Sequence, residues 1–553
     1  METSHRGGPS SQKCHERSGW SLVAEGSGAF VFAAMVTFLV YGPQLRPGGF
    51  YNDDWLYLVA SRYSGGFEAA VRALDFLSFR PLMTLYWPAL FAVLGAEPTA
   101  HTAWTFAVAS LAVAAVFVLL RSLGLARVHS AAVALLVAIF PGADSTRLWP
   151  SMSANVLAVT LALMGFSMAL AAFRRDGRAA VLLHVGSLAL YLASVLLYEV
   201  AFSLILAAGI GYIAFFGRRA LRRWVIDIAC IGAVLAFVTS GTFYDPLPIA
   251  DMPEHARKVG RDAAFLLADS LWPPAHPSGV LATIVCALIA GVIGLAARRI
   301  HRSARTESNG ADHLRPWLAV AIGSLVAAVA SYGAIIPSPT LSPLGDGGQN
   351  RSNVLAGIWL LALLYSCIVL SARLVGDLVR APSWASSVVV AVAVAVMSIG
   401  SVVQVRRDQR HWERSALVQR YALDQIVTVQ PVLPKGATVF LFGIPSESAP
   451  GVPIFAASWD IGGALIKRFD DATLSGLPVV ERSTIECRAD RIVLHNRNDS
   501  FGEQHVGYAK TYFIDANAPS SARITSRAAC VRVRLAMTQA GLLAADPHAS
   551  AQG

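Results

Sequence analysis

The amino-acid sequence predicts an all-α polytopic membrane protein with a small α/β domain at its C-terminal end. Of the 553 residues, 55% are hydrophobic and only 14% are charged, whereas a soluble domain carries about 25% charged residues. Apolar runs long enough to cross a bilayer recur between residues 22 and 404. After residue 404 the composition changes, and short β-type runs alternate with turn residues. These three observations predict the fold class.

The predicted membrane domain, residues 22–404, contains about eleven runs near the length of about 20 apolar residues that a bilayer core requires. Residues 179–217 must form a tight hairpin that turns at Tyr198-Glu199. The run 128–143 is short, so the count is approximate. The predicted spans are 22–42, 98–120, 128–143, 149–173, 179–197, 199–217, 224–243, 276–297, 317–336, 353–372 and 384–404.

The basic residues predict the orientation of the chain in the membrane. The net charge is +10, and Lys and Arg cluster in the N-terminal tail 1–21 and in alternate connections between spans. Such clusters mark cytoplasmic loops, which explains the charge without a nucleic-acid partner. We therefore expect an inner-membrane protein with a cytoplasmic N-terminus. The basic clusters alternate between the two sides only if the apolar run 82–95 does not cross the membrane. We therefore expect this run to form a helix that lies on the outer surface. This places loop 43–97 outside.

The C-terminal region is predicted to be extracytoplasmic, or periplasmic. Residues 405–535 are expected to form a small α/β domain, with strands at "ATVFLFGI", "DRIVLHN" and "CVRVRL". Residues 536–553 are expected to form a flexible tail. Cys487 and Cys530 can form a disulfide if this region faces an oxidising compartment; two free thiols are the equal alternative.

Polar side chains concentrate at the outward-facing ends of the predicted spans. The first group is the adjacent pair Asp53-Asp54, which directly follows the first span. We expect these groups to gather around one outer cavity. The other groups are Asp75 with Arg80, Asp144 with Arg147, Glu199 alone, and Asp346, Gln349, Asn350 and Arg351.

Acidic and basic groups at a membrane surface suit a substrate with an anionic head and a hydrocarbon tail, such as a polyprenyl-phosphate sugar. Transfer of the sugar to a hydroxyl needs a base, which a carboxylate can provide. The leaving phosphate needs positive charge, which an arginine provides. Two adjacent carboxylates repel each other, and partial burial raises the pKa of at least one.

Motifs in loop 43–97 resemble those of the GT-C superfamily of polyprenyl-phosphate-dependent membrane glycosyltransferases. Members include protein O-mannosyltransferases and lipid A aminoarabinose transferases. The resemblance rests first on "YNDDW" and on "FRPLMTLYWPALFAVLGAEPTAH", which follows Asp75. It rests also on "LLYEVAF", which contains Tyr198-Glu199. The pair is Asp-Asp here, whereas the mannosyltransferases commonly have Asp-Glu.

The resemblance implies a glycosyltransferase that moves a hexosyl or pentosyl group to an extracytoplasmic glycan, lipid or protein hydroxyl with inversion. It implies that Asp53 is the catalytic base and that Asp54 is its partner, or a ligand if the enzyme uses a divalent metal cation. Asp75, Arg80, Glu199 and Arg351 are the expected substrate- and phosphate-binding residues. Membrane lipids are the remaining partners. The resemblance does not identify the sugar or the acceptor, and it does not say whether the enzyme needs a metal.

Structural interpretations of the same residues also stand. Asp53-Asp54 can cap a helix that begins near Trp55, and Arg80 can start the surface helix and form a salt bridge with Asp75. Arg351 lies at the end of a span, where long side chains reach the interface. The alternative functions are a transporter or flippase for a lipid-linked or small anionic substrate, and a non-catalytic glycolipid-binding scaffold.

Overall fold

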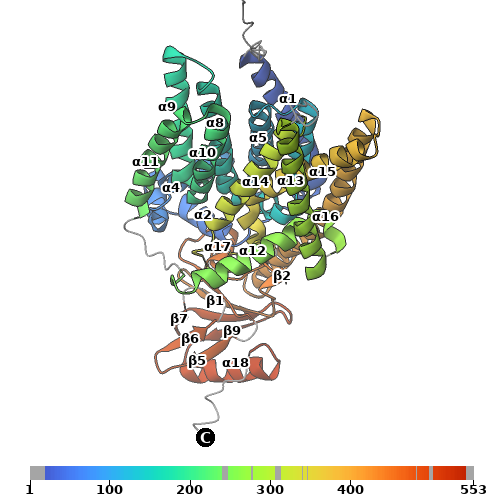
Figure 1. The fold of residues 1–553 in the computed structure, drawn as a ribbon. Coiled ribbons are helices and arrows are strands. Elements are labelled where there is room, and N and C mark those ends of the chain that lie inside the picture. The colour runs from blue at the N-terminus through green and yellow to red at the C-terminus, as the bar shows by residue number, and fades with distance from the viewer. Residues whose placement is uncertain are drawn as a thin grey trace, which may run out of the picture.

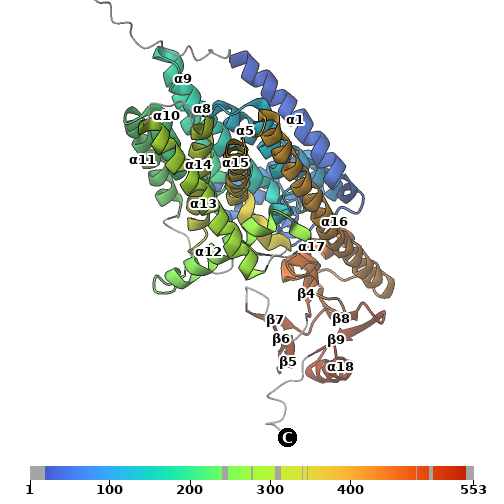
Figure 2. The same ribbon diagram turned by 45° about the vertical axis from the view of Figure 1, so that its right-hand side comes forward.

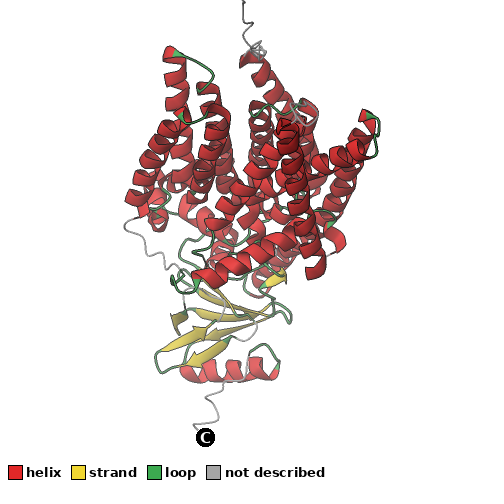
Figure 3. Cartoon of the chain, viewed as in Figure 1, coloured by secondary structure: helices red, strands yellow, loops and turns green. Residues whose placement is uncertain are grey.

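The computed structural model describes residues 19–239, 247–275, 278–305, 313–338, 341–345, 347–480, 483–496 and 502–543. A helical bundle forms most of the molecule, and all the strands lie in a small region near the C-terminal end, at one end of the bundle (Figures 1 and 3). We call that end of the bundle the domain-side end. Asp346 lies outside the described residues.

Every predicted span coincides with a helix of the bundle. Eight of the described helices are long and apolar enough to cross a membrane: α1, α5, α8, α9, α13, α14, α15 and α16. The other three predicted spans correspond to α6, α10 and α11; α6 and α10 are short, and charges occupy the first half of α11. The chain is therefore a polytopic membrane protein, while the count of eleven is not confirmed. The bounds are α1 (Gly19–Tyr41), α5 (Pro98–Ser122), α6 (Arg127–Ala138), α8 (Met152–Ala172), α9 (Gly177–Leu197), α10 (Phe202–Phe216), α11 (Arg219–Thr239), α13 (Gly279–Arg305), α14 (Arg315–Gly333), α15 (Asn353–Leu378) and α16 (Ser383–Val429).

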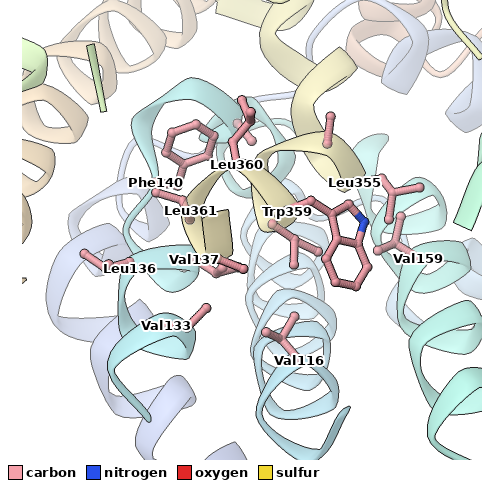
Figure 4. Packing of buried hydrophobic residues seen from close by; sticks show 14 of the residues in the cluster. Val116, Val133, Leu136, Val137, Phe140, Val159, Leu355, Trp359, Leu360 and Leu361 are labelled. Atoms are coloured by element: carbon pink, nitrogen blue, oxygen red, sulfur yellow. The ribbon is translucent and has the colours of Figure 1, made fainter. Parts of the chain in front are cut away.

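Helix α15 lies at the centre of the bundle. Its sequence is apolar on all sides, which is typical of a helix surrounded by other helices. Figure 4 shows Leu355, Trp359 and Leu360 of this helix among Phe140 and Val159 from neighbouring segments. The core of the membrane domain therefore forms around α15, and the polar groups are left to the ends of the bundle.

The first loop contains helices α2 (Asp53–Arg62), α3 (Phe67–Ala73) and α4 (Pro81–Leu94), with a 3-10 turn at Asp75–Leu77. Helix α4 is the predicted non-crossing helix. Its 14 residues span about 21 Å, which is shorter than a bilayer core of about 30 Å. Pro81 begins the helix, and Gly95 ends it with a φ of +68°, a conformation that favours glycine.

The predicted boundary at residue 405 falls inside a single helix, because α16 continues to Val429. Beyond it a four-stranded sheet has the order β4-β1-β8-β9, with β1 parallel to β4 and β8, and β9 antiparallel to β8. An antiparallel sheet β5-β6-β7 and a hairpin β2-β3 complete the strands. The bounds are β1 (Thr438–Phe442), β2 (Glu447–Ala449), β3 (Val452–Pro453), α17 (Ser458–Phe469), β4 (Ser475–Pro478), β5 (Thr484–Cys487), β6 (Arg491–His495), β7 (Glu503–Gly507), β8 (Thr511–Asp515), β9 (Ser520–Ile524) and α18 (Arg527–Gln539).

The prediction of a strand at "CVRVRL" is wrong, because these residues form part of α18. Alternating Val and Arg look like a strand of period two. In the helix, Cys530, Val533 and Met537 recur at helical spacing and pack against the sheet core. The Ser526 hydroxyl accepts a hydrogen bond from Ala529 N at 3.3 Å and caps the helix. Cys530 forms a disulfide with Cys487 of β5, so the pairing considered from sequence is present.

Sequence patterns did not lead us to expect helix α12 (Met252–Asp269). It lies across the domain-side end of the bundle, between the bundle helices and the strands (Figures 1 and 2). Val259, Leu266 and Leu267 form its buried face, while residues such as Arg257 and Lys258 are exposed. The helix forms one wall of a polar cavity described below.

Candidate functional site

The acidic pair occupies the first turn of α2, immediately after a residue with unusual backbone geometry. Asn52 has φ +42° and ψ −114°, which costs a non-glycine residue about 1–3 kcal/mol. Trp459 of α17 holds it there, because the indole Nε1 donates a hydrogen bond to Asn52 Oδ1 at 2.9 Å. The C-terminal domain therefore helps to set the direction in which Asp53 and Asp54 point.

Asp54 is a buried structural carboxylate. Only 2% of it is exposed, and burial raises its pKa. Tyr51 N donates a hydrogen bond to Asp54 Oδ2 at 2.8 Å, and the Ser151 hydroxyl donates to Oδ1. Asp54 thus ties the start of α2 to the start of α8. No side chain caps the start of α2, which begins at Asp53, so the expectation that the pair caps a helix near Trp55 is wrong.

Asp53 differs from its neighbour, since the residue is partly exposed. Within the described chain its carboxylate forms no hydrogen bond and no ion pair. Burial raises the pKa of this carboxyl, while the positive charges of Arg351 and Arg80 lower it. Asp53 is therefore the member of the pair with free acceptor capacity, and two arginines are its charged neighbours.

Arg80 and Glu199 form a two-pronged ion pair. Arg80 Nε donates to Glu199 Oε2 at 2.6 Å, and Nη2 donates to Oε1 at 2.5 Å. The guanidinium also lies 4.5 Å from the centre of the Tyr198 ring. This pair joins the start of α4 to the turn between α9 and α10. The alternative of an Arg80–Asp75 salt bridge is wrong, and Asp75 is exposed on the 3-10 turn before α4.

Arg351 is the second arginine near Asp53, and none of the described carboxylates forms a salt bridge with it. Its guanidinium lies 5.2 Å from the centre of the Trp149 ring. Trp149 is fixed in turn, because its Nε1 donates a hydrogen bond to Tyr51 O at 2.9 Å. The guanidinium is half-buried, so its hydrogen-bond donors remain available for an anion.

Sequence reasoning missed the residues that hold the two acids in place. Asn52, Ser151 and Trp459 were not selected as site residues, although Asn52 lies inside the quoted motif "YNDDW". Of these three residues, only Asn52 could have been recognised from the sequence, because asparagine adopts a positive φ more readily than most residues. Trp459 is 407 positions from its partner, so no local pattern could connect them.

The described residues do not fit a metal site at the acidic pair. Both oxygens of Asp54 already accept hydrogen bonds in a buried position. No group of three or more His, Cys, Asp or Glu side chains in the described ranges is arranged to hold a metal ion. Asp54 therefore acts in this structure as an anchor of α2.

The polar groups at the domain-side end of the bundle lie in two separate places. Asp53, Arg80, Glu199 and Arg351 surround the start of α2, and we call these four residues the Asp53 centre. Asp144 instead lines a separate cavity, together with Asn350. Asp53 lines none of the four clearest cavities of the described chain. The expectation of one shared cavity is therefore wrong.

Comparisons with known proteins give a distant similarity. No family model matches the chain, and no curated protein matches it. Two crystal structures of the Archaeoglobus fulgidus oligosaccharyltransferase, a member of the GT-C superfamily, are similar to it. One is the apo form, and the other is tethered by a disulfide bond to an acceptor peptide that contains the NVT sequon.

These two similarities are weak in quantitative terms. Each has a TM-score of 0.38 and 14% sequence identity, and they cover 82% and 84% of this chain. The chain spans 64% of the length of those solved chains. The TM-score is too low for two folds to be treated as the same, so the similarity assigns no role to any residue here.

Proposed function

We propose that the protein is an integral membrane glycosyltransferase. It would move a sugar from a polyprenyl-phosphate donor to an extracytoplasmic hydroxyl of a glycan, lipid or protein. The observation that carries this proposal is the state of Asp53: a partly exposed residue whose carboxylate has no described hydrogen-bond partner and whose charged neighbours are Arg351 and Arg80. A free base beside positive charge suits deprotonation of a hydroxyl near a phosphate.

The proposed reaction is a single displacement. Asp53 removes the proton from the acceptor hydroxyl as its oxygen attacks the anomeric carbon of the donor sugar. The bond between that carbon and the phosphate oxygen breaks, and the electron pair leaves with the phosphate. The acceptor oxygen enters opposite the leaving group, so the configuration inverts. The phosphate leaves as an anion, and no general acid is required.

The arginines would have different roles in this reaction. Arg351 carries no described salt bridge, so we assign it the donor phosphate, which guanidinium groups bind in a two-pronged geometry. Arg80 is already paired with Glu199, and the pair would position α4 and add charge at longer range. Asp75 is exposed and would contact the substrate only if the donor extends along the loop.

The disulfide supports the proposed orientation of the chain. Cys487 and Cys530 are bonded in the C-terminal domain, and such bonds persist in oxidising compartments such as the periplasm. Asn52, which directly precedes Asp53, contacts the same domain through Trp459, so the Asp53 centre and the domain would both face the extracytoplasmic side of the inner membrane. Impermeant labelling of an added cysteine at exposed Asp490 tests this, since labelling of intact cells is expected only from outside.

Transfer from a defined donor tests the function. The full chain in lipid nanodiscs is incubated with polyprenyl-phosphate hexose or pentose and with glycan, lipid or peptide acceptors, and release of polyprenyl phosphate is measured. We expect sugar-dependent release that Asp53→Asn abolishes and that Glu68→Gln, in the exposed Glu68–Arg72 pair of the same loop, leaves intact. Transport across the bilayer without release would support the transporter alternative, and binding alone would support the scaffold.

A further inference from the structure

The C-terminal domain contacts the two elements that carry Asp53 and Arg351. Helix α17 packs against α2, which begins at Asp53, and we call this the α17 contact. The β2-β3 hairpin packs against the 3-10 turn Gly347–Ser352, which contains Arg351, and we call this the hairpin contact. The proposed base and the proposed phosphate-binding residue lie far apart in the sequence, yet the elements that carry them are supported by one domain.

The α17 contact is too close to admit a side chain at Gly463. A Cβ atom there would lie 2.9 Å from Trp55 Cβ and 3.0 Å from Trp55 O, whereas non-bonded carbon atoms ordinarily lie about 3.5–4.0 Å apart. One helical turn earlier, Trp459 Nε1 donates its hydrogen bond to Asn52 Oδ1 at 2.9 Å. Helix α17 therefore meets α2 on both sides of the acidic pair, at Asn52 and at Trp55.

Lys467, one further turn along α17, fixes the same helix to the end of the first loop. Its Nζ donates a hydrogen bond to Ala96 O at 2.7 Å and lies 5.4 Å from the centre of the Phe50 ring. Phe50 precedes α2 and Ala96 follows α4. Helix α17 is therefore attached to both ends of the helical part of the loop, so a shift of the domain would move α2 with it.

The hairpin contact is made by backbone atoms. Gly348 N donates a hydrogen bond to Gly451 O at 2.7 Å. Gly347 has a φ of +51°, and a Cβ atom there would lie 2.5 Å from both Gly451 C and Gly451 O. Glu447 Oε2 accepts a hydrogen bond from Gly451 N at 3.0 Å and holds the hairpin turn in place. The turn that carries Arg351 therefore rests on the domain with no room for a side chain between the two backbones.

The proposed reaction requires the base and the phosphate-binding group to stand at a fixed separation, because the acceptor oxygen and the leaving phosphate occupy opposite sides of one anomeric carbon. Within the bundle, Trp149 connects the two elements through Tyr51 O and the Arg351 guanidinium. We propose that the C-terminal domain supplies the second connection and sets the alignment of Asp53 with Arg351. Trp459, Gly463 and Gly347 are then positioning residues. This inference rests on the proposed function.

Steady-state kinetics of the full chain in nanodiscs, with the donor and acceptors of the transfer assay, distinguish the two contacts. Gly463→Ala and Trp459→Phe disturb α2 and should lower kcat by about 10–100-fold with little change in the donor KM, since a misplacement of about 1 Å can cost about 100-fold in rate. Gly347→Ala disturbs the Arg351 turn and should instead raise the donor KM by about tenfold, as expected for a weakened hydrogen bond to a charged group.

Two glycine substitutions are matched controls. Gly462→Ala, in the same helix as Gly463, would place its Cβ 3.4 Å from Gly476 N, an ordinary contact. Gly177→Ala, at a φ of +63° with no atom within 4 Å of the added Cβ, reproduces the backbone strain of Gly347→Ala without the close contact. Both controls should leave kcat and donor KM unchanged. Folded Gly463→Ala and Gly347→Ala proteins that behave like their controls would overturn the proposal.

Thiol labelling provides a readout that does not depend on transfer. Anionic and cationic methanethiosulfonates are compared on an Asp53→Cys chain that keeps the Cys487–Cys530 disulfide and has serine in place of the other cysteines. The anionic reagent should react faster, because Arg351 and Arg80 are the charged neighbours of this position.

Gly463→Ala and Gly347→Ala should each reduce this preference for the anionic reagent, and Gly462→Ala and Gly177→Ala should not. A preference that both test substitutions leave intact would overturn the proposed alignment, whether or not the chain transfers a sugar. A reduced preference in a chain that transfers no sugar would support the alignment and count against the proposed function alone.

Discussion

The Asp53 centre and the neighbouring cavity that Asp144 lines differ in their charged groups. In the Asp53 centre, one open carboxylate has Arg351 and Arg80 as neighbours. In the cavity, Asp144, Asp269 and Asp408 belong to the lining, and no described lining residue is Lys or Arg. Trp149 and Trp412 stand between the two. The comparison teaches that one end of the bundle holds two polar places with different charged groups, and that packed aromatic rings separate them.

The largest expected effect separates Asp53 from Asp54. Asp53→Asn removes the proposed base and should lower the transfer rate by about 10²–10⁴-fold with little change in thermal stability. Asp54→Asn loses one of two buried acceptor oxygens and should instead reduce the free energy of unfolding by about 1–3 kcal/mol. Transfer assays and thermal unfolding of both purified variants check this. A folded Asp54→Asn protein without activity beside an active Asp53→Asn protein would reverse the assignment.

The two arginines should also differ. Arg351→Ala should raise the KM for the donor by about 10–150-fold, which corresponds to the 1.5–3 kcal/mol of a hydrogen bond to a charged group. Arg80→Ala leaves Glu199 without its partner, so its main effect should be a lower midpoint of thermal unfolding. Donor titrations and unfolding scans of both variants measure these effects. Equal effects on KM would mean that both arginines contact the donor.

Ser151→Ala tests the hydrogen bond that holds Asp54 in place. The Ser151 hydroxyl donates to buried Asp54, and its removal leaves an acceptor unsatisfied at a cost of about 1–3 kcal/mol. We expect a lower unfolding temperature and a partial loss of transfer, because α2 is less well placed. Ser78→Ala, at an exposed serine of the same loop, is the matched control. Unchanged unfolding of Ser151→Ala would show that the hydrogen bond contributes nothing.

The smallest expected effect is a shift in pH dependence. Burial raises the pKa of Asp53, and only its ionised form can act as a base. Transfer should therefore fall as the pH drops through this raised pKa. Arg351 lowers the same pKa, so Arg351→Gln should move the acid limb to higher pH. The pH profile of kcat/KM for both proteins measures the shift. If the acid limb does not move, Arg351 does not influence the pKa of Asp53.

The bundle was predictable from sequence because apolar length is a local property. Each predicted span coincides with a helix, and the surface helix near Pro81 was expected from the charge alternation. Helix α18 was not predicted, because the Val-Arg alternation after Cys530 imitates a strand until the packing of its neighbours is known. Helix α12 was not predicted because it is amphipathic, and its sequence contains no long apolar run of the kind that marked the other helices.

The candidate site was predictable only in part. Arg80, which the sequence suggested as a phosphate-binding residue, lies near enough to Asp53 to lower the pKa of its carboxyl; the roles of both residues stay predictions. The pairing of Arg80 with Glu199 joins positions 119 residues apart, and no spacing rule connects them. The cavity that Asp144 lines was not predicted either, because its lining comes from segments that are far apart in the sequence.

Helix α16 is continuous from the bundle to the C-terminal strands, so its length sets the distance between them. It runs for 47 residues, about 70 Å, without interruption. Gln419 on this helix donates a hydrogen bond from Nε2 to Ile454 O at 2.7 Å, and the domain reaches back through Trp459 to Asn52. Adding one residue to the helix would rotate the domain by about 100°. Related chains should therefore change the length of α16 by whole turns or not at all.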